Sequence, residues 1–339
     1  MSDKVKSLIE LSKNIGARPE YVQGGGGNTS VKMGQNKMII KASGFRLSEI
    51  CARRGLVAVD YQKIVRFYSS VKEGESISRI AGENSRVINE SVYKKKSGEN
   101  VRPSIETGFH SLAGKFVIHS HSVYANILNC SQEGKNILSE IFKDSVFVPY
   151  YPPGVFLTIG VKNALRKKKS HTFFLENHGI VVSGETAEEA YGRHEEATRL
   201  IKRKLKINSP YPKVSVALGE NGCFRSESSE VSDLIRKHKK TVKNFGKMVL
   251  FPDQVVYGDD VGFCHGAGFG IQIDVDKGAI FYNNMSYNKV LTFEEVFIAW
   301  LFIIDQIHQL GMTLKTISKK EIAFISNMES EKYRKKLCT

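Results

Sequence analysis

Three histidines are spaced as ligands of one metal ion. His119 and His121 are separated by a single residue and end the segment 115–121, whose apolar start predicts a buried strand. Alternate residues of a strand point to the same face, so the two imidazoles can converge on one ion. His178 follows a second apolar run, 172–175, and would complete a set that leaves one position open for water or substrate, as in catalytic zinc sites. Alone, a His-x-His pair is also a common chance feature of a half-exposed strand.

A carboxylate lies thirteen residues ahead of the histidine pair, at Glu106. Beside a metal ion, a carboxylate can move a proton between a substrate carbon and solvent. Pro103 favours the start of a helix close to Glu106, because proline is well tolerated in a first turn. Glu106 therefore has a second interpretation, as a helix-start residue that the positive end of the helix dipole stabilises.

A glycine run near the N-terminus has the composition of an anion-binding loop. Gly24–Gly27 precede Asn28-Thr29-Ser30, and a predicted hairpin with its turn at 34–36 leads to Ser43-Gly44. Glycines allow backbone N–H groups to turn toward one point and form a nest for an anion. The alternative interpretation is a flexible surface loop. The spacing fits neither a Walker loop nor a dinucleotide fingerprint.

Together, these residues resemble the class II (zinc-dependent) aldolase family, which also contains ribulose-phosphate 4-epimerases and adducin head domains. The resemblance covers about residues 20–200 and is closest to the rhamnulose-phosphate-aldolase-like half of bifunctional aldolase/short-chain dehydrogenase proteins. In those proteins the C-terminal part is also similar, through LFPDQVVYGDD and NMESEKYRKKL. The six segments that match, in the family's order, are GGGGNTSVK, IKASG, RPSIETGFH, FVIHSHSVYANIL, PYYPPG and LENHGIVVSGETAEEA.

The resemblance implies an α/β fold with two regions. Residues 1–207 are expected to form a three-layer α/β/α catalytic core around a central mixed or antiparallel sheet, and residues 208–339 a smaller α+β region. Within the second region the residue patterns predict a linker or a substrate-proximal loop at 208–230, a helix at 231–243, and a small antiparallel sheet at 255–283. They also predict a helix at 292–310 that starts with a Thr292/Glu295 capping box.

The resemblance also assigns roles to particular residues. His119, His121 and His178 would hold Zn²⁺ or another divalent transition metal, with Glu106 as the acid/base carboxylate. The family uses a tyrosine, often from a neighbouring subunit, to move a proton at the departing fragment. Tyr151 is the candidate for that role here, with Tyr150 and Tyr333 as alternatives. The residues expected to bind a substrate phosphate are Gly27, Asn28, Ser43, Gly44 and Ser104.

The implied reaction is the cleavage of a phosphorylated ketose to dihydroxyacetone phosphate and an aldehyde. A sugar-phosphate epimerase or a decarboxylase would use the same stabilisation of an enediolate, and the residues do not separate these three activities. An adducin-like scaffold is the non-enzymatic alternative, and the presence of all three histidines and Glu106 argues against it. A small phosphorylated sugar is the expected partner, and a homo-oligomer, for example a tetramer, is the expected assembly.

Composition is consistent with a cytoplasmic enzyme. Five scattered cysteines among 339 residues, without CxxC spacing, indicate reduced thiols. The longest apolar run, 296–304, is too short to span a membrane. The formal charge of +15 gathers in clusters at expected helix ends and loops, and it could steer phosphorylated substrates. No RNA-binding signature accompanies these clusters, so neither nucleic acid nor membrane is expected as a partner. The basic clusters lie at 94–96, 166–169, 202–206 and 236–243.

Overall fold

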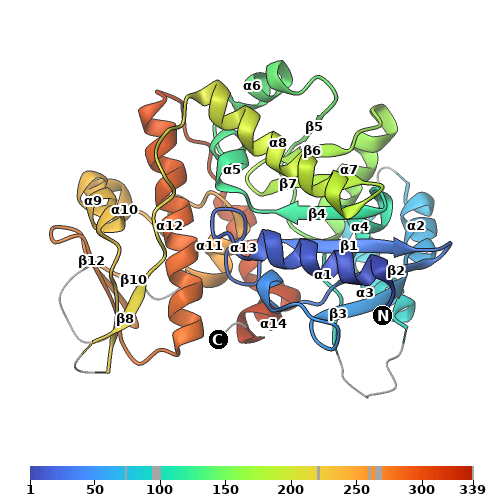
Figure 1. The fold of residues 1–339 in the computed structure, drawn as a ribbon, viewed down its shortest axis with the longest axis horizontal. Coiled ribbons are helices and arrows are strands. Elements are labelled where there is room, and N and C mark those ends of the chain that lie inside the picture. Colours follow the sequence, from blue (N-terminus) through green and yellow to red (C-terminus); the bar gives the residue numbers. More distant parts are fainter. Residues whose placement is uncertain (73–74, 94–100, 220–221, 259–260, 264–268, 338–339) are drawn as a thin grey trace.

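A seven-stranded mixed sheet forms the centre of the N-terminal region. The computed structural model describes all residues except 73–74, 94–100, 220–221, 259–260, 264–268 and 338–339. The strand order is β3-β2-β1-β4-β7-β6-β5, and all neighbours are antiparallel except β5 and β6 (Figure 1). The strands are β1 (Asn28–Met33), β2 (Lys37–Lys41), β3 (Leu56–Asp60), β4 (Phe116–Ser120), β5 (Val146–Val148), β6 (Thr172–Leu175) and β7 (Gly179–Gly184).

Helices cover both faces of this sheet, which confirms the predicted three-layer core. All five residues of β4 are buried. Phe116 and Ile118 belong to an apolar cluster shared with α1, α5 and α8, whereas Val117 packs in a different cluster with residues of α4 and α7. This alternation follows from the two-residue period of a strand buried on both faces. The helices of the region are α1 (Asp3–Gly16), α2 (Tyr61–Ser70), α3 (Ile77–Ser91), α4 (Thr107–Leu112), α5 (Val123–Asn129), α6 (Gly134–Ile141), α7 (Val155–Lys167) and α8 (Ala187–Leu205), with a 3₁₀ turn at Leu47–Glu49.

The C-terminal region contains a second, smaller sheet and a long buried helix. The sheet has the order β10-β11-β12-β9-β8, and helix α12 packs against α5 of the first region (Figure 1). Residues around Trp300 in α12 are buried on all sides of the helix. The strands are β8 (Val216–Leu218), β9 (Phe224–Ser226), β10 (Val261–Gly262), β11 (Ile271–Asp274) and β12 (Ala279–Tyr282). The helices are α9 (Ser229–Lys237), α10 (Lys239–Val242), α11 (Pro252–Tyr257), α12 (Tyr287–Gln309), α13 (Lys319–Asn327) and α14 (Glu329–Leu337).

The predicted capping box at Thr292 and Glu295 is wrong. Helix α12 begins five residues earlier, at Tyr287, and the Ser286 side chain caps it by accepting a hydrogen bond from the backbone N–H of Lys289. Glu295 lies inside the helix and accepts hydrogen bonds from Arg46 and from the backbone N–H of Gly24. Thr292 and Glu295 therefore contact the N-terminal region and do not cap the start of the helix.

Three other expectations for the C-terminal region need correction. The predicted linker at 208–230 contains two strands, β8 and β9, which join the second sheet. The predicted helix at 231–243 is two helices, α9 and α10, separated at His238. The predicted antiparallel sheet at 255–283 is mixed, because β10 and β11 are parallel, and its first residues belong to helix α11.

A single apolar cluster crosses the predicted domain boundary at residue 207. It contains Leu8 and Ile118 from the first region together with Ile235, Phe251 and Trp300 from the second. The division at 207 therefore remains a prediction about domain organisation. Among the described helices, none combines the length and apolarity needed to cross a membrane.

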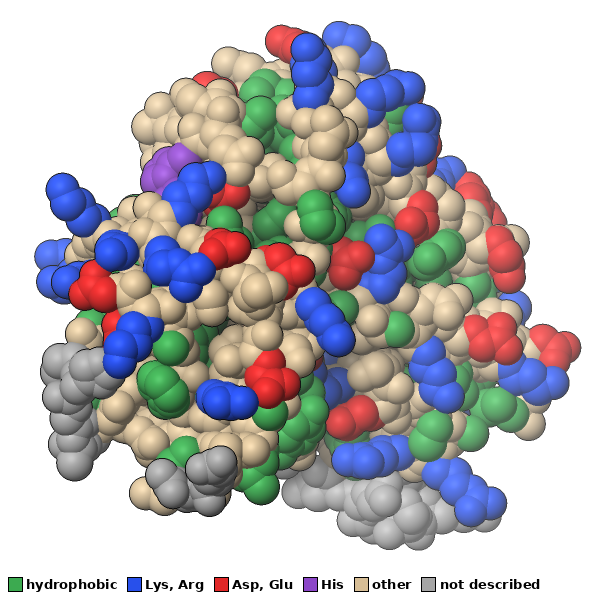
Figure 2. Space-filling model, turned by 60° about the vertical axis from the view of Figure 1, so that its left-hand side comes forward, with side chains coloured by type: hydrophobic (Ala, Val, Ile, Leu, Met, Phe, Trp, Pro, Cys, Tyr) green, Lys and Arg blue, Asp and Glu red, His purple; other side chains and the backbone are tan. Residues whose placement is uncertain are grey.

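Several basic clusters lie at helix ends, as expected. Arg166 and Lys167 occupy the last turn of α7, Lys202 to Lys204 that of α8, and Arg236 and Lys237 that of α9. Cations are favourable there because the C-terminus of a helix carries a partial negative charge. Figure 2 shows that Lys and Arg side chains alternate with Asp and Glu over the visible face. The cluster at 94–96 lies outside the described residues.

Candidate metal centre

Strand β4 and a tight turn bring the three histidines together. His119 lies near the end of β4 on the face that Val117 shares, and His121 follows immediately after the strand. His178 lies in the short connection between β6 and β7. Asn177 in that turn has a positive φ of 49°, a conformation that asparagine tolerates better than most residues. Its side-chain amide donates to the backbone carbonyl oxygens of Leu250 and Lys315, which anchors the turn to the C-terminal region.

The histidine nitrogens are close enough to bind one ion. His119 Nε2 and His121 Nε2 are 3.2 Å apart, and one nitrogen from each histidine lies within 4.8 Å of the others. Two nitrogens bound to a tetrahedral zinc ion at about 2.05 Å would be about 3.3 Å apart. All three side chains are buried. The spacing and the neutral donor set therefore fit a divalent transition metal.

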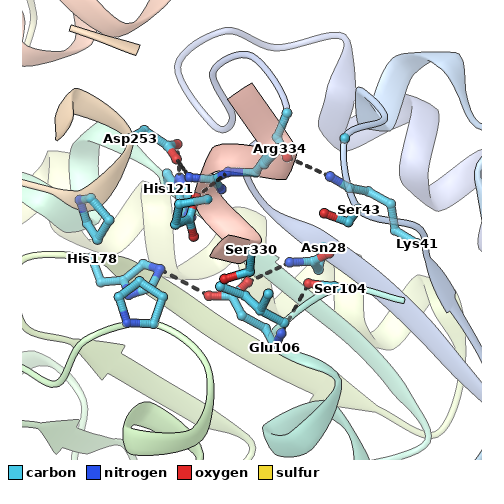
Figure 3. A pocket seen from close by; sticks show the side chains of 16 residues that line it. Asn28, Lys41, Ser43, Ser104, Glu106, His121, His178, Asp253, Ser330 and Arg334 are labelled. Carbon is cyan, nitrogen blue, oxygen red and sulfur yellow. Dashed lines mark hydrogen bonds and ion pairs between the residues drawn. The ribbon is translucent and has the colours of Figure 1, made fainter. Parts of the chain in front are cut away.

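Glu106 faces these histidines from the N-cap position of α4. It stands just before α4, and its side chain makes no capping hydrogen bond. One carboxylate oxygen lies 3.2 Å from His178 Nε2 and 3.5 Å from His119 Nε2, while the other accepts a hydrogen bond from Asn28 Nδ2 (Figure 3). Burial disfavours the charged carboxylate, but the neighbouring imidazoles of His119 and His178 outweigh it and hold the pKa of Glu106 well below its ordinary value. Glu106 is therefore a carboxylate at neutral pH.

For two of the three histidines, burial favours the neutral form that binds metal. Burial lowers the pKa of His119 well below its ordinary value and also lowers the pKa of His178, although the nearby Glu106 opposes both shifts. A neutral imidazole has a free lone pair for an ion. Proton competition for these two ligands is therefore weak at neutral pH.

A pocket joins the histidines to the predicted anion-binding residues. His121, His178 and Glu106 line one part of it, and the remaining walls include Asn28, Lys41, Ser43, Gly44 and Ser104. An isolated bridge between Ala42 and Pro103 and a hydrogen bond from the Ser43 backbone N–H to the Arg102 carbonyl hold the two loops together. The cavity is about 20 Å³, which is room for roughly one water molecule or ion.

Two predicted site residues do not reach the pocket. Gly27 has a positive φ of 66°, and a Cβ there would meet the Val22 side chain at 2.6 Å and the backbone oxygen of His119 at 2.9 Å. Its lack of a side chain thus lets β1 begin close to β4, and it is not a pocket wall. The ring of Tyr151 lies against Gly160 of α7, which also keeps it out of the pocket lining.

The two alternative tyrosines are also absent from the pocket lining within the described residues. Tyr150 is mostly buried, and burial raises the pKa of its hydroxyl, with the nearby Glu321 adding to the shift. The ring of Tyr333 lies under the Arg102 guanidinium, 4.5 Å from its centre.

Five further polar or charged side chains line the pocket, and the residue pattern did not single them out. Lys41 is buried at the end of β2, and its ammonium group donates to the Gly25 carbonyl at 2.7 Å. The others come from the C-terminal region: Asp253 on α11, and Ser330, Glu331 and Arg334 on α14 (Figure 3). All five lie inside the matching segments IKASG, LFPDQVVYGDD and NMESEKYRKKL. The resemblance therefore covered these residues, although it assigned none of them a role in the site.

Comparison with known proteins matches the N-terminal region to one family. The profile described as Class II Aldolase and Adducin N-terminal domain matches residues 6–205. The uncharacterized oxidoreductase YuxG of Bacillus subtilis is 28% identical over 200 residues, 55% of this chain and 27% of the relative. This chain thus spans about a quarter of that longer protein's length.

For two other similar proteins, the match covers a larger share of the relative's length. The 3-oxo-tetronate 4-phosphate decarboxylase of Haemophilus influenzae is 25% identical over 198 residues, 56% of this chain and 80% of the relative. The solved N-terminal class II aldolase domain of a conserved protein from Thermoplasma acidophilum is 27% identical with a TM-score of 0.51, over 60% of this chain and 93% of that one.

Proposed function

This chain belongs to the class II aldolase and adducin family, and from that premise we propose that it is a metal-dependent carbon–carbon lyase. The proposed reaction cleaves a phosphorylated ketose into dihydroxyacetone phosphate and an aldehyde. The observation that carries the proposal is one pocket whose walls combine a three-histidine cluster, a buried carboxylate and a set of anion-binding groups. An adducin-like scaffold would have no need to keep these side chains together.

His119, His121 and His178 would hold the ion, which we propose to be Zn²⁺. A divalent ion held by neutral imidazoles keeps its positive charge and would stabilise the negative charge that develops on the substrate oxygen when the bond breaks. The chain supplies three buried ligands, and charge interactions are stronger in buried surroundings than in water.

Glu106 is the pocket carboxylate that lies beside the histidines His119 and His178, and it can carry a proton. Cleavage moves one proton from the hydroxyl of the departing fragment to the carbon that keeps the electron pair of the broken bond. A carboxylate that is ionised at neutral pH can take up that proton and release it again. Asn28 donates to Glu106 and so fixes the direction in which its second oxygen points.

The opposite wall suits a phosphate. Asn28, Ser43 and Ser104 offer side-chain donors, Gly44 offers a backbone approach, and Lys41 brings a positive charge. A phosphate bound away from the reacting carbon supplies binding energy that orients the substrate.

Decarboxylation of a phosphorylated 3-oxo acid is the second candidate, and the match to the H. influenzae decarboxylase favours it. It would use the same metal site and the same phosphate wall, and it differs in releasing carbon dioxide. A sugar-phosphate epimerase shares the scaffold too. We also propose a homo-oligomer, because no tyrosine among the described residues lines the pocket and a neighbouring copy can supply one.

Metal analysis followed by parallel substrate screens tests the proposal. Purified protein should hold about one divalent ion per chain, and phosphorylated ketoses should yield an aldehyde. If phosphorylated 3-oxo acids release carbon dioxide and none of the ketoses yields an aldehyde, the activity is that of a decarboxylase. A protein that binds no metal and turns over neither class would refute a metal-dependent lyase.

The variant Glu106→Gln tests the role of the carboxylate. It should keep the metal and lower kcat by about 10²- to 10⁴-fold, the usual size of a general acid–base contribution. Glu294→Gln is the matched control, since Glu294 is a buried carboxylate that binds Tyr282 and Ser226 beside the second sheet. The control should change stability but not kcat, and equal loss in both variants would remove Glu106 from the mechanism.

A further inference from the structure

The three histidines differ in what binds the nitrogen that faces away from the metal site. His119 Nδ1 donates to the backbone carbonyl oxygen of Ile180 at 3.1 Å. His178 Nδ1 has no hydrogen-bond partner among the described residues. His121 Nδ1 lies 2.5 Å from the carboxylate oxygen Oδ2 of Asp253. Among the described residues, His121 is thus the one of the three whose outward-facing nitrogen contacts an ionisable side chain.

Asp253 is in turn held by a cation from the last helix. It is fully buried on α11, and its second oxygen, Oδ1, accepts a hydrogen bond from Arg334 Nη2 at 2.6 Å (Figure 3). Arg334 also pairs with Glu331 at 2.8 Å and lies over the Tyr257 ring. Each oxygen of Asp253 therefore has a fixed partner, and the carboxylate has little freedom to rotate.

We propose that Asp253 and Arg334 are positioning residues for the metal ligand His121, so that the C-terminal region completes a metal centre whose ligands all lie within residues 6–205. This inference rests on the proposed metal site. A carboxylate that accepts a hydrogen bond from Nδ1–H keeps the proton on that nitrogen and leaves the Nε2 lone pair free for the ion. Arg334 keeps the carboxylate aimed at His121.

The substitution Asp253→Asn tests this arrangement through the tautomer of His121. An amide has one accepting and one donating end, and the charged Arg334 will take the oxygen. The NH₂ group then faces His121 Nδ1, which can only accept from it, so the ring proton moves to Nε2 and blocks the ligand atom. Affinity for Zn²⁺ or Co²⁺, measured by competition with a chromophoric chelator at fixed pH, should fall by about 10- to 100-fold.

Removing the cation should partly reverse that loss. In the double variant Asp253→Asn/Arg334→Met, nothing holds the amide oxygen away from His121, so the amide can rotate and accept from Nδ1–H. The double variant should therefore bind the metal more tightly than Asp253→Asn alone. A purely structural role predicts the opposite order, because the second substitution removes a further buried contact.

Asp305→Asn is the matched control. Asp305 is also buried, and its carboxylate also lies between an imidazole and a cation, 2.7 Å from His238 Nε2 and 2.7 Å from Lys237 Nζ. It lies outside the pocket lining, so its substitution should lower stability and leave metal affinity unchanged. If Asp253→Asn does not fold, Asp253→Ala removes the carboxylate without adding a donor, and it should weaken metal binding in a way that Arg334→Met does not restore.

The outcomes separate the two proposals. Wild-type affinity in Asp253→Asn, or a double variant that binds no better, would overturn the positioning role while leaving the metal site intact. Wild-type protein that binds neither Zn²⁺ nor Co²⁺ would overturn the metal site and the positioning role together. Weak binding in Asp253→Asn, recovery in the double variant and normal binding in Asp305→Asn is the result we expect.

Discussion

At the scale of single residues, the pocket contains a charge that the residue pattern left unassigned. Lys41 is 2% exposed and donates to a backbone carbonyl at the phosphate wall. The ammonium group of Lys41 can form a charge-assisted hydrogen bond with an anion in the pocket. Its position beside Asn28, Ser43 and Ser104 places that anion at the same wall as the predicted phosphate.

The substitution Lys41→Met should raise KM for a phosphorylated substrate by roughly 10- to 100-fold, because a hydrogen bond to a charged group contributes about 1.5–3 kcal/mol. An unphosphorylated analogue should lose much less, since it makes no use of the cation. Steady-state kinetics with both substrates measures the difference.

Lys32→Met is the control for this test. Lys32 is a partly buried lysine that does not line the pocket. Its ammonium group donates to the Ala113 carbonyl. Burial lowers the pKa of Lys32 to about 8. KM should be unchanged in this variant, and a Lys41→Met protein with equal losses on both substrates would contradict the phosphate assignment.

At the scale of elements, Glu295 of helix α12 holds both the glycine loop, through a backbone hydrogen bond, and the segment after β2, through an ion pair. Glu295 of α12 binds Arg46 at 2.8 Å and accepts from the Gly24 backbone N–H at 2.7 Å, while Arg46 also donates to Thr292. The side chains of Glu295 and Arg46 are 10% and 18% exposed. A helix of the C-terminal region thus fixes the start of the loop that leads into β1.

Glu295→Ala should lower the free energy of unfolding by roughly 3 kcal/mol, near the lower end of the range for breaking a buried pair, because Arg46 keeps some contact with water. Urea denaturation at neutral pH measures this loss. Glu196→Ala is the comparison, since Glu196 pairs with Arg199 on the exposed surface of α8, and it should cost less than about 0.5 kcal/mol. Similar midpoints for the two variants would mean that the contact does not stabilise the fold.

The elements also show what the sequence could predict. Strand β4 and its histidines were predictable, because a buried strand has a two-residue period that puts His119 and His121 on one face. The start of α12 was not, because Ser286 and Thr292 are both acceptable caps and only the tertiary contact of Thr292 with Arg46 decides between them. The contact between Asp253 and Arg334 could not be predicted for the same reason. It depends on how α11 packs against α14 and not on local spacing in the sequence.

At the scale of the whole molecule, several histidines are buried where the two regions and the layers of the core meet. His110, His119, His178 and His194 are each at most 2% exposed. A buried imidazole is costly to protonate, because its charged form loses hydration. Folding should therefore become less favourable in acid, where the unfolded chain binds protons that the folded chain excludes.

His110 allows this to be tested away from the metal ligands themselves. Burial lowers the pKa of His110 to about 3, although the nearby Glu106 opposes the shift, and its Nδ1 shares a hydrogen bond with Ser30. In the unfolded chain an ordinary histidine has a pKa of about 6.5. Because the folded value is the lower one, the stabilisation is present above about pH 6.5 and is lost as the pH falls toward 3. The loss for this one group approaches about 1.4 kcal/mol per pH unit.

Urea unfolding of chelator-treated protein between pH 7.5 and 4.5 should show this decline. The variant His110→Gln keeps a side chain that can bond Ser30 but has no proton to gain, so its stability should fall less steeply over the same range. The other buried histidines are present in both proteins, and their contribution cancels in the difference between the two slopes. Parallel curves for the wild type and the variant would show that His110 is protonated as readily in the folded chain as in the unfolded one. The acid sensitivity of the fold would then come from the other buried titratable groups, His119, His178 and His194 among them.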